Sequence, residues 1–109
     1  MSTAQLRGAR AEQRAARLFG VRRQLRLRFE SKGDIELVRL PCGLPLSVEV
    51  KTRSKLPRLI VKAMEQARAY EPAAVPACVI SELGSAPLLV LPLRAFCVVA
   101  GIGADKVGA

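Results

Sequence analysis

Residues 22–51 constrain the fold most, because three short segments of alternating apolar and polar residues follow one another there with only brief turns between them. In the first segment Leu25, Leu27 and Phe29 alternate with polar residues, which is the pattern of a half-buried strand. Connections of a few residues join antiparallel neighbours, since parallel strands need a long crossover. The sequence therefore predicts an antiparallel meander over residues 22–29, 35–40 and 46–51, with turns at 31–34 and 41–45.

Helical and strand patterns on both sides of this meander complete a mixed fold. Residues 3–19 are rich in helix-forming residues and end at Gly20, and residues 59–70 show helical spacing before Pro72. Two further strands and a short helix are expected over residues 77–82, 87–91 and 93–100, with the second strand apolar enough to be buried on both faces. We predict a single α/β domain over residues 1–109, with a mixed sheet flanked by helices.

The first predicted helix has two different faces, and Ser2 or Thr3 is its candidate cap. Ala9, Ala16 and Phe19 fall on one side, and Glu12 lies among them. The other side carries a stripe of four basic residues: Arg7, Arg10, Arg14 and Arg17.

The charge of the chain indicates a polyanionic partner. Eighteen Lys and Arg against nine Asp and Glu give a net charge of +9, which favours nucleic acid, although a basic surface without such a partner is the alternative. The three cysteines, Cys42, Cys78 and Cys97, show no C-x-x-C spacing and are expected to be buried thiols in a reducing cytosol. Neither a secretory signal nor a membrane-spanning stretch is evident, so we expect a soluble cytoplasmic protein.

The chain contains no histidine, so any catalysis must rest on carboxylates, lysine or a metal ion. Glu49 and Lys51 are two positions apart in the third strand and project from one face. Asp34 begins the preceding strand, where it can approach Glu49 across the hairpin. Carboxylates suit a hard cation such as Mg²⁺, and Lys51 can orient a water or neutralise developing charge. The alternative is that all three are ordinary solvated strand and turn residues.

The succession of Gly33-Asp34, a hairpin and Glu49-Val50-Lys51 resembles the PD-(D/E)xK nuclease superfamily, although Gly33 replaces the proline of the strict motif. The resemblance implies a restriction-endonuclease-like, mixed five-stranded sheet flanked by helices. It also implies Mg²⁺, with Mn²⁺ as a substitute, held by Asp34, Glu49 and Val50, and catalysis by Lys51.

Two further positions extend this resemblance. Glu12 matches the helical glutamate that similar nucleases bring to the metal, and Gln66 with Tyr70 resembles an auxiliary Gln-x-x-x-Tyr motif of some members. The alternatives are a solvated helix carboxylate at Glu12 and an ordinary tyrosine at the edge of the core.

Within the superfamily, the sequence from Leu6 to about Val99 is most similar to the archaeal-type Holliday junction resolvases. Ser31 falls where these enzymes carry a serine-bearing loop, although serine is also an ordinary turn residue. The resemblance implies a homodimer that makes paired nicks in four-way DNA junctions during recombination or repair, in the host cytoplasm if the chain is phage-encoded. Phe96, Val98 and Val99 are candidate interface residues, or they complete the core.

Basic residues surround the proposed centre in the sequence and are candidate contacts to DNA phosphates. Such contacts position the duplex without reading its bases, which suits selection by shape, whereas the few aromatic residues disfavour single-stranded recognition. The candidates are Arg7, Arg10, Arg14, Arg17, Arg28, Lys32, Arg53 and Lys55, with Arg22, Arg23, Arg26 and Arg58 nearby. Two alternatives stay open: another PD-(D/E)xK nuclease that cuts duplex or flap DNA, and a non-catalytic DNA-binding module.

Overall fold

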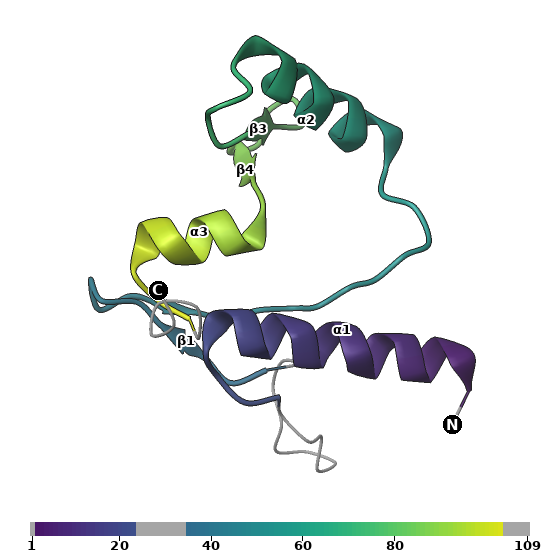
Figure 1. Ribbon diagram of the computed structural model, residues 1–109, viewed down its shortest axis with the longest axis vertical. Helices are drawn as coiled ribbons and strands as arrows, with labels where there is room; N and C mark the ends of the chain where they lie inside the picture. Colours follow the sequence, from purple (N-terminus) through teal and green to yellow (C-terminus); the bar gives the residue numbers. More distant parts are fainter. Residues whose placement is uncertain (1, 24–34, 104–109) are drawn as a thin grey trace. The chain divides into compact units, whose positions relative to one another are not determined.

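A computed structural model describes residues 2–23 and 35–103, and Figure 1 shows a mixed α/β structure. The described chain divides into two compact units, residues 1–52 with 97–109 and residues 53–96, and the prediction of one domain stays a prediction. The elements in chain order are α1 (Thr3–Phe19), β1 (Val38–Arg39), β2 (Pro45–Leu46), α2 (Arg58–Tyr70), β3 (Cys78–Ile80), β4 (Leu88–Val90) and α3 (Leu93–Ala100).

The ends of α1 are both fixed by local hydrogen bonds. Ser2 caps the helix: its Oγ accepts from the Gln5 main-chain N–H at 3.1 Å, and its own N–H donates to Gln5 Oε1 at 2.8 Å. The helix ends at Gly20, whose N–H donates to the carbonyls of Ala16 and Arg17. Ala16 and Phe19 are buried, so the predicted helix and its apolar face are confirmed.

The β1–β2 hairpin turns around residues 41–43. Gly43 donates its N–H to the Leu40 carbonyl at 2.9 Å and takes a φ of 99°, the left-handed geometry that closes a three-residue hairpin loop. Leu40 in turn donates to the Leu44 carbonyl at 3.0 Å. The strands pair antiparallel, Val38 with Leu46 and Arg39 with Pro45. The reversal predicted for residues 41–45 is confirmed.

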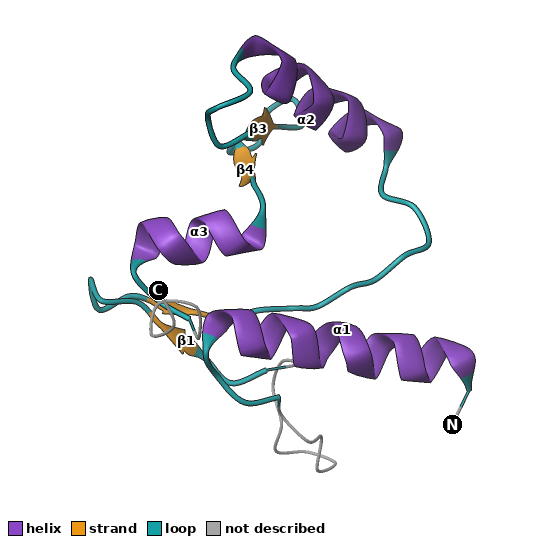
Figure 2. Cartoon of the chain, viewed as in Figure 1, coloured by secondary structure: helices purple, strands orange, loops and turns teal. Residues whose placement is uncertain are grey.

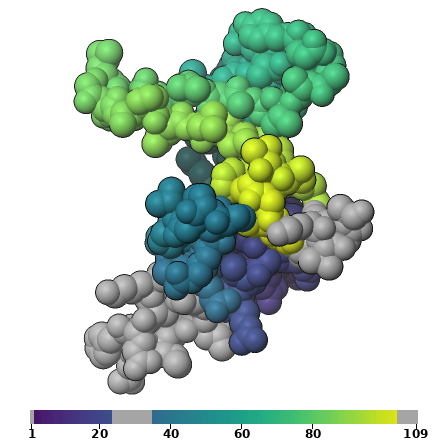
Figure 3. Space-filling view, turned by 90° about the vertical axis from the view of Figure 1, so that its left-hand side faces the viewer, coloured from purple at the N-terminus to yellow at the C-terminus, as the bar shows by residue number. Residues whose placement is uncertain are grey.

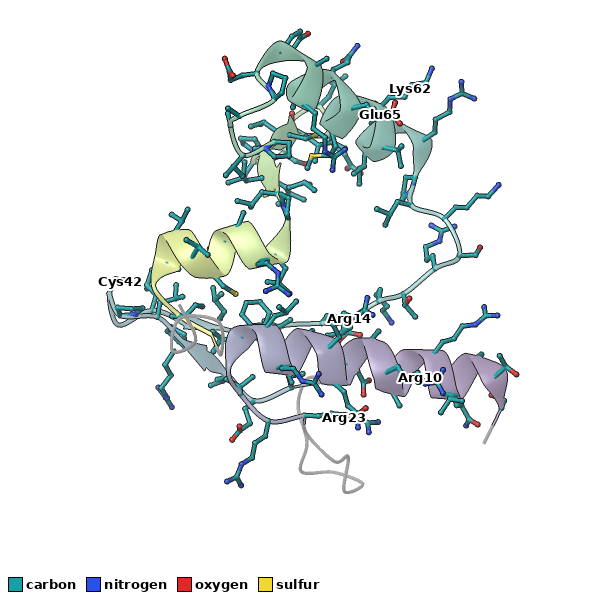
Figure 4. The ribbon with its side chains drawn as sticks, viewed as in Figure 1. Arg10, Arg14, Arg23, Cys42, Lys62 and Glu65 are labelled. Atoms are coloured by element: carbon teal, nitrogen blue, oxygen red, sulfur yellow. The ribbon has the colours of Figure 1, made fainter. Side chains whose placement is uncertain are left out.

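Cys42, labelled in Figure 4, is exposed in this turn, whereas Cys78 and Cys97 are buried. The expectation that all three thiols are buried is therefore wrong for Cys42. Its apolar sequence neighbours misled the prediction, because a tight turn carries its central residues on the surface.

The meander is paired over a shorter length than the sequence predicts. In the part of the chain that the structure describes, its first two strands meet through a β-bridge between Arg23 and Ile35, and the Glu36 N–H donates to the Arg22 carbonyl at 2.9 Å. Residues 47–51 are extended without an assigned ladder, although Val48 and Val50 are half-buried and the residues between them are exposed. The strands of residues 2–23 and 35–103 form two two-stranded sheets, and a five-stranded sheet is not shown.

The apolar core of the first unit collects residues from distant parts of the sequence. Its buried apolar side chains are Ala16, Phe19, Ile35, Val38 and Cys97. Figure 3 shows the surface of the β1–β2 hairpin, in blue, beside the C-terminal part of α1. Gly103 belongs to the same unit and lies so close to the end of α1 that a Cβ atom there would overlap the Leu18 carbonyl oxygen.

The second unit consists mainly of α2 and the β3–β4 hairpin. α2 contacts β3, and Met64 and Cys78 are buried. β3 pairs antiparallel with β4 across the predicted Gly84-Ser85 turn, which confirms that hairpin. Leu88 and Leu89 are 67% and 61% exposed, so the expectation of a strand buried on both faces is wrong. The reason is that β3 is the strand that contacts α2, whereas β4 lies beyond it.

α3 confirms the short helix predicted for residues 93–100. Its Val98 and Val99 are exposed, while Phe96 is half-buried. Within the described residues, no helix combines the length and the apolar character that crossing a membrane requires.

Candidate active site

Glu49 and Lys51 form an ion pair on one face of the extended segment that follows β2. Lys51 Nζ lies 3.2 Å from Glu49 Oε1, and the two side chains are 80% and 56% exposed. Val48 and Val50, on the opposite face, are half-buried, so the predicted two-residue alternation is confirmed. An ion pair this exposed contributes at most about 1 kcal/mol, so the Glu49 carboxylate can exchange Lys51 for another cation at little cost.

Asp34 lies outside the described residues, as do three other predicted site residues, Arg28, Ser31 and Lys32. Its chain neighbour Ile35 is described and is 2% exposed. The approach of Asp34 to Glu49 stays a prediction.

Glu12 lies on the half-buried face of α1, as predicted, and its carboxylate has a specific partner. Its Oε2 accepts a hydrogen bond from Arg23 Nε at 2.6 Å, with the Glu12 side chain 18% and the Arg23 side chain 33% exposed. Sequence reasoning treated Arg23 as a phosphate contact and missed this pair. The position of Glu12 in the sequence could have indicated that it has a partner, because a carboxylate on an apolar helix face requires a cation or hydrogen-bond donor.

Glu36 has a role that the sequence did not indicate. Its Oε1 accepts a hydrogen bond from the Arg22 main-chain N–H at 2.6 Å, and its own N–H donates to the Arg22 carbonyl. The two segments at Arg22 and Glu36 are therefore held together by both main-chain and side-chain bonds.

The basic residues proposed to contact DNA are on the surface wherever the structure describes them. All four arginines of the α1 stripe are exposed, and Figure 4 marks Arg10 and Arg14 on this helix. Arg53 and Lys55 are exposed in the loop that precedes α2, drawn teal in Figure 2. All of these charges are accessible to a polyanion.

Gln66 and Tyr70 lie on α2 in the second unit, and both are exposed, Tyr70 to 82%. Their part in the site stays a prediction. The same unit contains an open pocket of about 520 Å³, mostly apolar, between the start of α2 and the β3–β4 hairpin. Leu59, Glu82 and Leu88 are among its lining residues.

The described residues contain no group of three or more Asp, Glu or Cys side chains placed to hold a metal ion, and Asp34 is not among them. Comparison of the chain with protein-family models, curated proteins and solved structures gives no match. The site is therefore interpreted from its own chemistry.

Proposed function

We propose that the protein is a metal-dependent DNA endonuclease, and that its substrate is a four-way DNA junction, which it cuts as a Holliday junction resolvase. The observation that carries the proposal is the Glu49–Lys51 pair, in which a carboxylate and an ammonium lie side by side on one face of an extended segment. This is the second half of the PD-(D/E)xK pattern. The first half is Asp34, which directly precedes Ile35 in the sequence, and its place beside Glu49 is part of the proposal.

The donor set fits a hard cation. The chain has no histidine, and the candidate ligands Asp34, Glu49 and Glu12 are all carboxylates, with Val50 contributing a main-chain oxygen. Oxygen donors of this kind suit Mg²⁺ or Mn²⁺. The exposed Glu49 carboxylate is accessible to such an ion, and Glu12 is held by Arg23. When bound, Mg²⁺ supplies polarisation of the scissile phosphate and activation of the attacking water.

The residues of the chain then have distinct tasks. Lys51 neutralises the negative charge that develops on the phosphate, as an ammonium within reach of the metal-binding carboxylate can do. The exposed arginines of α1 hold the backbone of the duplex, because contacts to phosphates give affinity without sequence preference. Ser31 and Gln66 are proposed as auxiliary residues of the same centre.

Paired nicks require two active sites related by twofold symmetry, so we propose a homodimer. Val98 and Val99, 71% and 78% exposed on α3, provide apolar surface for such an interface. The same proposal includes a restriction-endonuclease-like sheet of five strands and a protein that acts in the cytoplasm.

The substrate is tested by incubating the protein with Mg²⁺ and end-labelled four-way junction, linear duplex or flap DNA of the same arm sequences. Paired symmetric nicks in the junction alone are expected, and EDTA should abolish them. Preferential cutting of duplex or flap would retain the nuclease and refute the resolvase. Tight binding without cutting of any substrate would favour the alternative of a non-catalytic DNA-binding module.

A further inference from the structure

The second unit contains an open pocket that the proposed nuclease chemistry does not use. Its volume is about 520 Å³, and it is lined by Leu59 at the start of α2 and by residues 80–82, 85, 86 and 88 of the β3–β4 hairpin. We call it the hairpin pocket. Its volume falls within the range of sites that bind small organic molecules.

The register of the hairpin explains the apolar wall of this pocket. Ile80 and Leu88 are directly opposed in the β3–β4 ladder, so their side chains lie on one face. Cys78 shares this face and is buried, whereas Val79 and Leu89 on the opposite face are 72% and 61% exposed. Because α2 contacts β3, the face that the helix covers at Cys78 continues as an open apolar surface toward the turn.

The turn of the hairpin adds a carboxylate to this apolar surface. The Ser85 N–H donates to the Glu82 carbonyl at 3.1 Å, and Gly84 takes a φ of 81°, so the backbone of Glu82 is held by the turn. In the part of the chain that the structure describes, the Glu82 side chain has no hydrogen bond and no ion pair. A carboxylate beside apolar side chains is therefore available to a cation from outside the chain.

The charge of the hairpin pocket is opposite in sign to that of the chain. The chain has 18 Lys and Arg and a net charge of +9, yet Glu82 is the one charged side chain among the described residues that line the pocket. Arg58 and Lys62, the nearest basic residues of α2 to Leu59 in the sequence, are exposed and do not line it. The pocket therefore favours a cationic ligand, whereas the exposed basic residues favour polyanions.

We propose that the hairpin pocket binds a small amphipathic amine, an inference that is independent of the proposed nuclease function. The apolar chain of the amine lies against Leu59, Ile80 and Leu88, and its protonated amino group pairs with the Glu82 carboxylate. An ammonium has three N–H donors, and the hydroxyl groups of the two lining serines provide further acceptors. Recognition thus combines an apolar wall with a few placed polar groups, which is the usual composition of a small-molecule site.

Three probe molecules with the same eight-carbon chain test the chemical class of the ligand: octylamine, octanol and octanoate. Each is titrated at neutral pH into the isotope-labelled full chain, and the amide NMR signals report both the site and the Kd. Octylamine should shift the signals of residues 59, 80–82 and 85–88 and bind about two- to fivefold more tightly than octanol, as one solvent-accessible ion pair allows. Octanoate should bind these residues most weakly. Hexylamine should bind more weakly than octylamine, by up to about fourfold for each methylene removed.

Two pairs of variants separate the contribution of the carboxylate from that of the apolar wall. Glu82→Gln should weaken octylamine to the affinity of octanol, whereas Glu65→Gln, which removes the same charge from an exposed position of α2 outside the pocket, should bind octylamine as the wild type does. Leu88→Ala shortens a lining side chain that is 67% exposed and should weaken all three probes. Leu83→Ala, at a fully exposed leucine outside the lining, should weaken none of them. Thermal midpoints of the variants separate a folding defect from a binding defect.

The possible contrary results differ in what they refute. Octanoate that binds these residues as tightly as octylamine, or folded Glu82→Gln that binds octylamine as tightly as the wild type, would refute an amine as the ligand. Signal shifts by octylamine at other residues alone, or no shift with any probe, would refute the pocket as a binding site. Cleavage of DNA is measured separately, so neither result decides the proposed nuclease function.

Discussion

Gly103→Ala tests how the segment after α3 packs against the end of α1. Gly103 has a φ of 99°, and a Cβ atom there would overlap the main-chain carbonyl oxygen of Leu18. Gly43 has the same φ of 99°, but an added Cβ meets nothing within 4 Å. The two glycines belong to the same unit, so the pair separates the cost of the backbone conformation from the cost of the overlap.

The expected magnitudes follow from these two terms. Placing an L-residue at positive φ costs about 1–2 kcal/mol, which is the whole effect at Gly43. At Gly103 the overlap adds about 1–3 kcal/mol, because a main-chain oxygen cannot move aside as a flexible side chain can. For 109 residues, unfolding entropy of about 2.1 cal/mol/K per residue converts these values into a fall in Tm of about 4–9 °C for Gly43→Ala and about 9–22 °C for Gly103→Ala.

Thermal unfolding followed by circular dichroism, with urea denaturation as a second measure, gives both values. Gly103→Ala should unfold at the lower temperature by a clear margin. Equal midpoints for the two variants would show that residue 103 does not lie against Leu18, and would refute the packing of the first unit described above.

Three further predictions concern the surface of the chain. Gly8→Ala should raise the free energy of unfolding, measured by urea denaturation, by about 0.8–1 kcal/mol, because Gly8 lies within α1 and an added Cβ meets nothing within 4 Å. A lower free energy of unfolding would contradict the open surroundings of Gly8. The double variant Arg10→Ala with Arg14→Ala should bind the junction more weakly in gel-shift assays, and the steepness of log affinity against log salt concentration should fall by about 2. An unchanged slope would exclude both side chains as phosphate contacts. Native protein should react rapidly with a thiol reagent at Cys42 alone, and Cys42→Ser should abolish the rapid phase; persistence of that phase would place another cysteine at the surface.

Helices and tight turns were predictable from the sequence because their signals are local. Gly20 ends α1, and the residues around Gly43 reverse the chain, as their backbone preferences require. All three helices described in the structure follow the predicted spacing closely. These elements depend on residues within a few positions of one another.

Strand pairing and side-chain partners were less predictable because they depend on residues far apart in the chain. The alternation of apolar residues at positions 47–51 correctly predicted which side chains are exposed. It did not predict that these residues lie outside the strands of the structure. The partner of Glu12 lies 11 residues away, and its identity depends on how the chain turns after α1. Exposure of Leu88 similarly depends on which strand α2 contacts.

The most direct test of the account is the rate of junction cleavage in Mg²⁺ by the wild type and by two carboxamide variants, Asp34→Asn and Glu49→Gln. Both should lose at least about 100-fold in rate, equivalent to about 2.7 kcal/mol, while binding the junction as tightly as the wild type in a gel shift. Glu65→Gln, which changes an exposed carboxylate on α2, should cleave at the wild-type rate. Wild-type cleavage by Asp34→Asn and Glu49→Gln would contradict the assignment of the metal ligands and, with it, the proposed chemistry.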